Sequence, residues 1–167
     1  RVRIASTKSG GKGSFSTVTD LTIRNAPSFG TRQTFMTAGM PGDMLIEDVN
    51  NDGLADIVVS NVDGASVFVQ LQNKSAPGSF LSPAPTAVGM DNISGIGLGD
   101  FNRDGLIDIV ASDMAGNVTP LLQDSSNFAF LVGTSVAVGG TPNRPIVEDV
   151  NKDGLLDVIL STGSDIV

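Results

Sequence analysis

Carboxylate and amide side chains recur three times along the chain at one fixed spacing. The three segments read D-V-N-N-D-G-L-A-D from Asp48, D-F-N-R-D-G-L-I-D from Asp100 and D-V-N-K-D-G-L-L-D from Asp149. In each segment, positions 1, 3, 5 and 9 carry an oxygen-bearing side chain, and position 6 is glycine. Ca²⁺ takes six to eight oxygen ligands at about 2.3–2.6 Å, and a glycine lets the chain turn sharply around the ion. The spacing therefore predicts three calcium-binding loops.

The expected ligands are the four polar side chains of each loop and the backbone carbonyl of position 7, whose leucine side chain is left free for the core. They are Asp48, Asn50, Asp52, Leu54 and Asp56 in the first loop, Asp100, Asn102, Asp104, Leu106 and Asp108 in the second, and Asp149, Asn151, Asp153, Leu155 and Asp157 in the third. A chance Asp/Asn-Gly turn between strands would explain one copy, but not three copies that all keep aspartate at position 9. We expect a structural ion, since a catalytic metal needs an open coordination position beside acid–base groups.

The loops are not EF-hands. An EF-hand loop has a bidentate glutamate at position 12 and continues into a helix. Position 12 is Val59, Ala111 or Leu160 here, and it lies in a run rich in β-branched residues. Such runs are typical of buried strands.

The loops mark a repeat, because they begin at residues 48, 100 and 149. Each unit is expected to contain a short apolar strand, the loop, a second strand, an alternating third strand, a loop ending in an aromatic residue, and a last strand closing on Gly89 or Gly139. The first strands are expected at 44–46, 96–98 and 146–147, and the second strands at 56–60, 108–112 and 157–161. Four short strands in a repeat of about 50 residues are typical of a propeller blade. We predict an all-β fold of about three such blades.

The predicted boundaries place the second half of a blade at 1–30, full blades at 31–89 and 90–139, and the first half of a blade at 140–167. Arg1–Phe15 can be aligned without a gap on Ser66–Phe80, the second half of the first full blade. The chain thus begins and ends within a blade. Either it is a portion of a larger propeller, with neighbouring blades on the same polypeptide, or copies complete one another in a homo-oligomer.

The three D-x-N-x-D-G-x-x-D loops, each followed by an apolar strand, resemble the FG-GAP/VCBS family of integrin-α-like calcium-binding β-propellers. The resemblance extends over nearly the whole chain. It implies that the three loops bind one Ca²⁺ each through the side chains named above. Closed propellers of this kind usually have about seven blades, whereas this chain accounts for about three.

Composition excludes several function classes. A net charge of −8 without a basic stripe argues against nucleic-acid binding. The chain has no His, Cys, Trp or Tyr, so the usual nucleophile–base pairs are missing and we expect no enzyme activity. Half of the 18 acidic residues lie in the loops, so much of the negative charge is expected to serve as ligands.

The affinity expected of the predicted calcium loops also indicates where the protein is located. Loops built only from aspartate, asparagine and one carbonyl fall toward the weak end of the affinity scale, with Kd about 10⁻⁴–10⁻³ M as in extracellular modules. Such sites are filled outside a cell, so we expect a secreted or cell-surface protein. The lack of cysteine favours a bacterial source, and the sequence shows neither a signal peptide nor a membrane span.

These observations favour a non-enzymatic, calcium-stabilised β-propeller module for extracellular binding or adhesion, with a protein or a glycan as ligand. Two alternatives stay open at this point. The chain is the propeller portion of a secreted polysaccharide lyase or hydrolase whose catalytic residues lie outside it, or it is an architectural module that drives oligomerisation.

Overall fold

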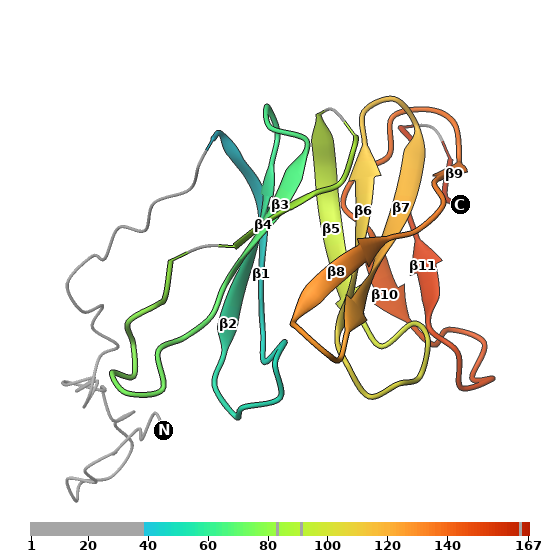
Figure 1. The fold of residues 1–167 in the computed structure, drawn as a ribbon. Coiled ribbons are helices and arrows are strands. Elements are labelled where there is room, and N and C mark those ends of the chain that lie inside the picture. Colours follow the sequence, from blue (N-terminus) through green and yellow to red (C-terminus); the bar gives the residue numbers. More distant parts are fainter. Residues whose placement is uncertain (1–38, 83, 91, 164) are drawn as a thin grey trace, which may run out of the picture. The chain divides into compact units, whose positions relative to one another are not determined.

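A computed structural model describes residues 39–82, 84–90, 92–163 and 165–167, which all belong to one compact unit, Met36–Val167. The half-blade expected at 1–30 lies outside the described residues. Regular structure in the described part of the chain consists of antiparallel β-strands without a helix, in three sheets (Figure 1). No helix in this part is therefore long and apolar enough to cross a membrane. The all-β prediction is confirmed.

The first sheet is an up-and-down array of four strands in the order β1-β2-β3-β4. Its strands are β1 (Pro41–Glu47), β2 (Asp56–Asn61), β3 (Ser66–Gln70) and β4 (Ala84–Ala87). The β-branched run after the first loop forms β2, whose central position in the sheet buries it on both faces. The sheet has the four strands that the repeat pattern predicts for a propeller blade.

The second sheet repeats this order with one strand more. Its strands are β5 (Ile93–Gly99), β6 (Asp108–Asp113), β7 (Asn117–Asp124), β8 (Ala129–Val132) and β9 (Val136–Ala137). The last strand, β9, pairs with the beginning of β7, whereas β8 pairs with its end. A loop ending in an aromatic residue, Phe128 or Phe130, and one last strand closing on Gly139 are expected here. The segment forms two strands, β8 and β9, so the expectation of a single last strand was wrong. The apolar run of 129–132 extends the sheet, while the first sheet has only an isolated bridge between Gln72 and Phe80 at this place.

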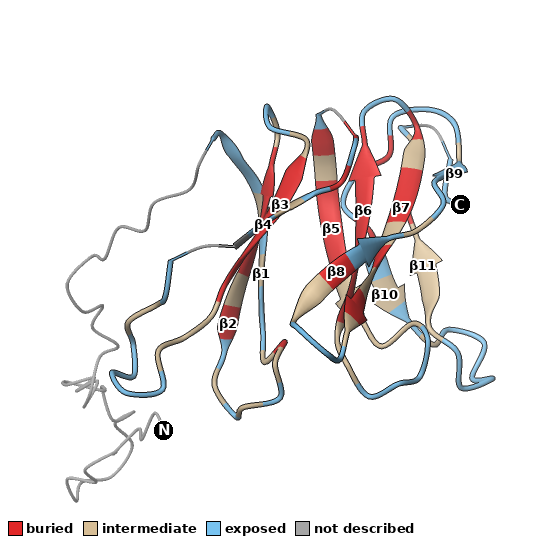
Figure 2. Cartoon of the chain, viewed as in Figure 1, coloured by how far each residue is buried: buried red, intermediate tan, exposed pale blue. Residues whose placement is uncertain are grey.

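The third sheet consists of two strands, β10 (Ile146–Glu148) and β11 (Asp157–Ile159). The strand expected at 157–161 is thus two residues shorter, and Ser161 forms an isolated bridge with Ile166 instead. Figure 2 shows that buried residues concentrate in β2, β3, β5, β6 and β7, whereas β10 and β11 are intermediate or exposed.

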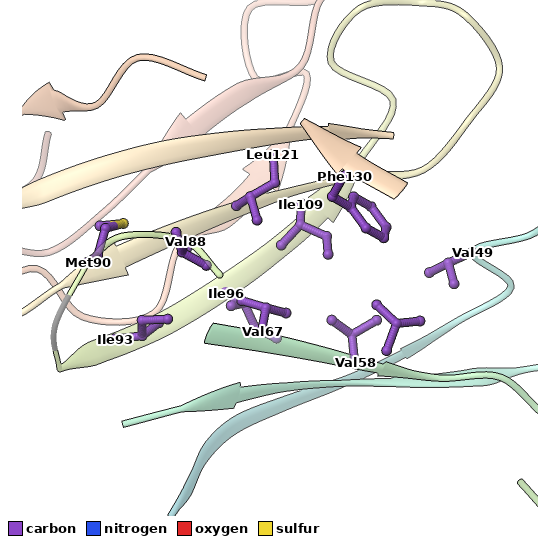
Figure 3. Close-up of a cluster of buried hydrophobic side chains, with 12 residues drawn as sticks. Val49, Val58, Val67, Val88, Met90, Ile93, Ile96, Ile109, Leu121 and Phe130 are labelled. Carbon is purple, nitrogen blue, oxygen red and sulfur yellow. The ribbon is translucent and has the colours of Figure 1, made fainter. Parts of the chain in front are cut away.

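The main core lies between the first two sheets (Figure 3). It combines valines of the first repeat with larger side chains of the second, all of them at most 8% exposed: Val49, Val58, Val67, Val69, Val88, Ile96, Ile109, Leu121 and Phe130. Burying a side chain of this size contributes roughly 1.5–3 kcal/mol. A second cluster around Val110, Val118 and Leu160 joins the second sheet to the third. The cores therefore form between blades, as expected of units that cannot bury an apolar face alone.

A carboxylate adds a polar link between the sheets. Asp43 of β1 accepts a hydrogen bond from the Ile96 amide of β5 at 3.2 Å, and it forms an ion pair of 3.3 Å with Arg144, just before β10. Because Asp43 is mostly buried while Arg144 is half exposed, the pair is less screened than one on an open surface. One side chain thus joins the first strands of the first two sheets to the segment just before the third sheet.

Candidate metal centre

Each polar loop connects the first two strands of a sheet. The loop after β1 leads into β2, the loop after β5 into β6, and the loop after β10 into β11. The glycines at position 6 have φ of +84°, +84° and +82°, in the region that only glycine adopts freely. The residues at position 4 are also left-handed, with φ of +55° at Asn51 and +62° at Arg103 and Lys152. These two positions let a nine-residue segment coil back on itself.

The carboxylate at position 1 organises the coil. In the first loop, Asp48 Oδ1 accepts a hydrogen bond from the Asp52 amide at 2.9 Å, and Asp48 Oδ2 accepts one from the Gly53 amide at 2.7 Å. The same two bonds recur in the second loop around Asp100 and in the third around Asp149, at 2.9–3.1 Å. The sequence repeat is therefore also a repeat of hydrogen bonds.

Positions 3 and 5 bond to each other and to the next turn. Asn50 Oδ1 accepts from the Asp52 amide at 3.0 Å, and Asp52 Oδ1 accepts from the Leu54 amide at 2.9 Å. The equivalent bonds in the other loops measure 2.7–3.0 Å. Each of positions 1, 3 and 5 thus directs at least one side-chain oxygen toward the amides inside the coil.

Position 9 ties the loop to the sheet. Asp56 is fully buried, and its oxygens accept from the amides of Val49 at 3.2 Å and Gln72 at 2.8 Å. Asp108 is equally buried and accepts from Phe101 at 3.0 Å and Gln123 at 2.8 Å. Asp157 is partly exposed and accepts from Val150 at 3.0 Å. The two buried aspartates join the start of the loop to the end of the third strand or to the residues just after it.

Burial makes a negative charge at position 9 costly. It raises the pKa of Asp56, and the amides of Gln72 and Val49 oppose that rise, while the charges of Asp52 and Asp48 add to it. Burial likewise raises the pKa of Asp108. Hydrogen bonds from the amides of Gln123 and Phe101 lower that pKa, and the charge of Asp104 raises it further. A cation in the loop would offset these costs, because an opposite charge nearby favours the ionised form.

The donor set fits a hard cation such as Ca²⁺. Each loop offers three carboxylates, one amide oxygen and a leucine carbonyl, and no nitrogen or sulfur ligand. A carboxylate oxygen has two lone pairs, so an oxygen that accepts one N–H bond keeps a further site for an ion. In the part of the chain that the structure describes, no three His, Cys, Asp or Glu side chains are already gathered as an ion site. The hydrogen bonds nevertheless place the predicted ligand side chains of each loop in one coil.

Two glutamines outside the loop segments also contact the loops, and the loop pattern does not mark them. Gln72 donates from its side chain to the Ala55 carbonyl at 2.8 Å. Gln123 donates to Ile107 at 3.2 Å and also to Val49 in the preceding loop at 2.8 Å. The sequence does contain a signal for them, since a glutamine recurs at a similar distance after the position 9 aspartate, 16 residues in one repeat and 15 in the next.

The leucines at position 7 differ in environment. Leu54 and Leu106 are partly buried, as expected of side chains directed to a core, whereas Leu155 is 50% exposed. The expectation was therefore wrong for the third loop. The sheet that follows this loop has only two strands in the described residues, so less apolar surface surrounds it.

Comparison with known families agrees with the repeat. The profile described as FG-GAP-like repeat matches residues 48–111 and again residues 100–160. Both matches begin at position 1 of a loop and include the sheet strands that follow it. A comparison with curated proteins gave no match.

Proposed function

The chain belongs to the FG-GAP-like repeat family, and from that premise we propose that it is a calcium-stabilised β-propeller module that binds a ligand outside the cell. The observation that carries the proposal is the threefold recurrence of one loop with the same donors and the same internal hydrogen bonds. The buried position 9 aspartates support it, because a bound cation would relieve the electrostatic cost of their charge.

The proposed role is binding rather than catalysis. The chain contains no His, Cys, Trp or Tyr, and its clustered aspartates are all loop residues. FG-GAP repeats are typical of extracellular proteins, where calcium is abundant enough for sites with Kd about 10⁻⁴–10⁻³ M. A rigid set of blades joined by surface loops suits recognition of an extracellular protein or glycan.

Thermal unfolding tests the calcium part of the proposal. Millimolar Ca²⁺ is expected to raise the Tm relative to chelator, because binding to the folded state alone stabilises it by about 0.4–1.4 kcal/mol per site at 1 mM for a Kd of about 10⁻³–10⁻⁴ M. Mg²⁺ at equal concentration serves as the control and is expected to do less, since it requires near-octahedral geometry at about 2.0–2.1 Å. Identical unfolding curves in calcium and chelator would contradict the proposal.

Ligand arrays test the binding part. The protein, labelled at its amino groups, is applied to arrays of extracellular proteins and glycans in calcium and in chelator. We expect retention on a restricted set of ligands in calcium, and loss of retention in chelator. A calcium-stabilised protein that retains no ligand on either array would leave the architectural alternative as the better account.

A further inference from the structure

The fourth residue of each loop is not an expected ligand, yet in two loops it contacts the next loop. Asn51 donates from Nδ2 to the Gly105 carbonyl at 2.9 Å, 54 residues further along the chain. Arg103 donates from Nη2 to the Gly154 carbonyl, 51 residues further along. Both acceptors are the position 6 glycine of the following loop. The side chains differ, but the position of the donor and that of the acceptor are the same.

The two donor residues share a backbone conformation. Asn51 and Arg103 are both left-handed, with φ of +55° and +62°. A Cβ added to Gly154 would lie 3.1 Å from Arg103 Nη2, which is a tight contact, whereas a Cβ added to Gly105 would meet no atom within 4 Å. Glycine at position 6 therefore provides the sharp turn of its own loop, and at Gly154 it also leaves room for the side chain from the preceding loop.

The hydrogen bond from the preceding loop and a hydrogen bond within the loop bind the same peptide group. The Gly154 carbonyl and the Leu155 amide belong to the same planar unit. Arg103 binds the carbonyl, and Asp153 Oδ1 accepts from the Leu155 amide at 2.7 Å. In the second loop, Asn51 and Asp104 hold the peptide group between Gly105 and Leu106 in the same way. This group lies between positions 5 and 7, both of which are expected ligands.

We propose that Asn51 and Arg103 are positioning residues that fasten the following loop, so that the three loops order as a linked row. The effect on calcium affinity rests on the proposed function, whereas the effect on loop order does not. Gln123 supplies a second link between the first two loops through the Val49 carbonyl. Lys152 holds the same position in the third loop, and it has no hydrogen-bond or ion-pair partner among the described residues.

Amide hydrogen exchange measured by NMR in calcium-free buffer tests the link itself. In Arg103→Ala, the amides of Asp153, Gly154 and Leu155 are expected to exchange about three- to tenfold faster, as for the loss of one hydrogen bond. Arg103→Lys keeps a donor and is expected to restore part of the protection. Lys152→Ala is the matched control, since it has the same φ as Arg103, and it should leave the first and second loops unchanged.

Three results would overturn the inference. The amides of the third loop exchange at an unaltered rate in Arg103→Ala. Their exchange quickens only as much as that of Ile57 and Val59 in β2, which indicates a general loss of stability. Or Lys152→Ala quickens the second loop as much as Arg103→Ala quickens the third.

A calcium titration of the same spectra separates this inference from the proposed function. If calcium protects the loops, the midpoint for the third loop in Arg103→Ala should shift upward by the same three- to tenfold factor. If calcium protects no loop of the unaltered protein, the proposed function fails. The exchange rates in calcium-free buffer still decide whether the loops are linked.

Discussion

At the scale of single residues, the aspartate at position 9 has a double role. Its place in the sequence predicts a ligand. In the structure, Asp108 accepts hydrogen bonds from backbone amides of two separate segments. It is the first residue of β2 and β6, where a polar residue is unexpected without such partners. The proposed ion site and the contact between the loop and the sheet thus involve the same carboxylate.

We expect Asp108→Ala to destabilise the calcium-free protein more than Asp157→Ala. Asp108→Ala leaves the buried amides of Phe101 and Gln123 without an acceptor, which should cost about 2–4 kcal/mol. Asp157 is more exposed, and one amide bonds to it, so its removal should cost about 1 kcal/mol or less. Urea unfolding measures the difference, and equal losses would show that burial does not set the role of position 9.

The pH dependence of stability follows from the raised pKa values of Asp56 and Asp108. The folded state binds protons here more readily than the unfolded chain, whose carboxyls have the ordinary value of 3.8. Their contribution to stability is therefore fully present below that value and is lost as pH rises through the raised pKa values. Urea unfolding in calcium-free buffer at several pH values should reveal this loss.

The double variant Asp56→Asn/Asp108→Asn is the control for the pH series, because it removes both titrating groups. Its stability should fall less steeply above pH 4 than that of the unaltered protein. The same pH profile in both proteins would show that other groups dominate.

The coiled loops could be predicted from the sequence, because a loop is a local structure whose spacing is written in consecutive residues, while the role of their side chains as ligands stays a prediction. Gln72 and Gln123 could not, since their amides reach position 9 only when the third strand pairs in the correct register. The links from Asn51 and Arg103 depend on how one blade packs on the next. Residue spacing alone does not show this.

At the scale of elements, strands that flank a loop were predicted well and the outer strands less so. Apolar runs beside a polar loop mark both strands of a hairpin, as in β1–β2 and β5–β6. The edge strand β8 was not predicted, because a strand at the edge of a sheet forms only where the folded chain brings it beside a partner. The strand β7 pairs with β8 through 121–124 and with β9 through 117–118.

The second sheet offers a comparison of two leucines in neighbouring strands. Leu121 of β7 is fully buried in the main core, whereas Leu131 of β8 is 61% exposed. Leu121→Ala should cost about 2–5 kcal/mol through lost transfer energy and the cavity left behind. Leu131→Ala should change stability by about 0.5 kcal/mol or less. Denaturant unfolding of both variants tests this, and similar costs would contradict the placement of the core.

At the scale of the whole molecule, the repeat period predicted the separation into blade-like sheets. The homo-oligomer and the neighbouring blades of a larger propeller both stay predictions, and so do the blade boundaries. The number of strands that each sheet completes could not be inferred from the period, because pairing at an edge depends on which other segments reach it.

The described sheets should differ in their resistance to opening. In the described residues the third sheet has two strands, whose residues are intermediate or exposed, and a sheet of two strands depends for its stability on packing against other elements. The amides of Val158 and Ile159 in β11 should therefore exchange faster than those of Ile109 and Val110 in the centre of the second sheet. Native-state hydrogen exchange measures both, and equal protection would mean that the chain opens as one cooperative unit.

The hydrogen bonds between loops bear on how such a chain can grow. Their acceptor is a backbone carbonyl of a glycine that every loop already has, and the donor is asparagine in one case and arginine in the other. A duplicated repeat therefore brings its own acceptor and accommodates more than one type of donor upstream. Gene duplication can then lengthen the array without a matching substitution in the neighbouring copy.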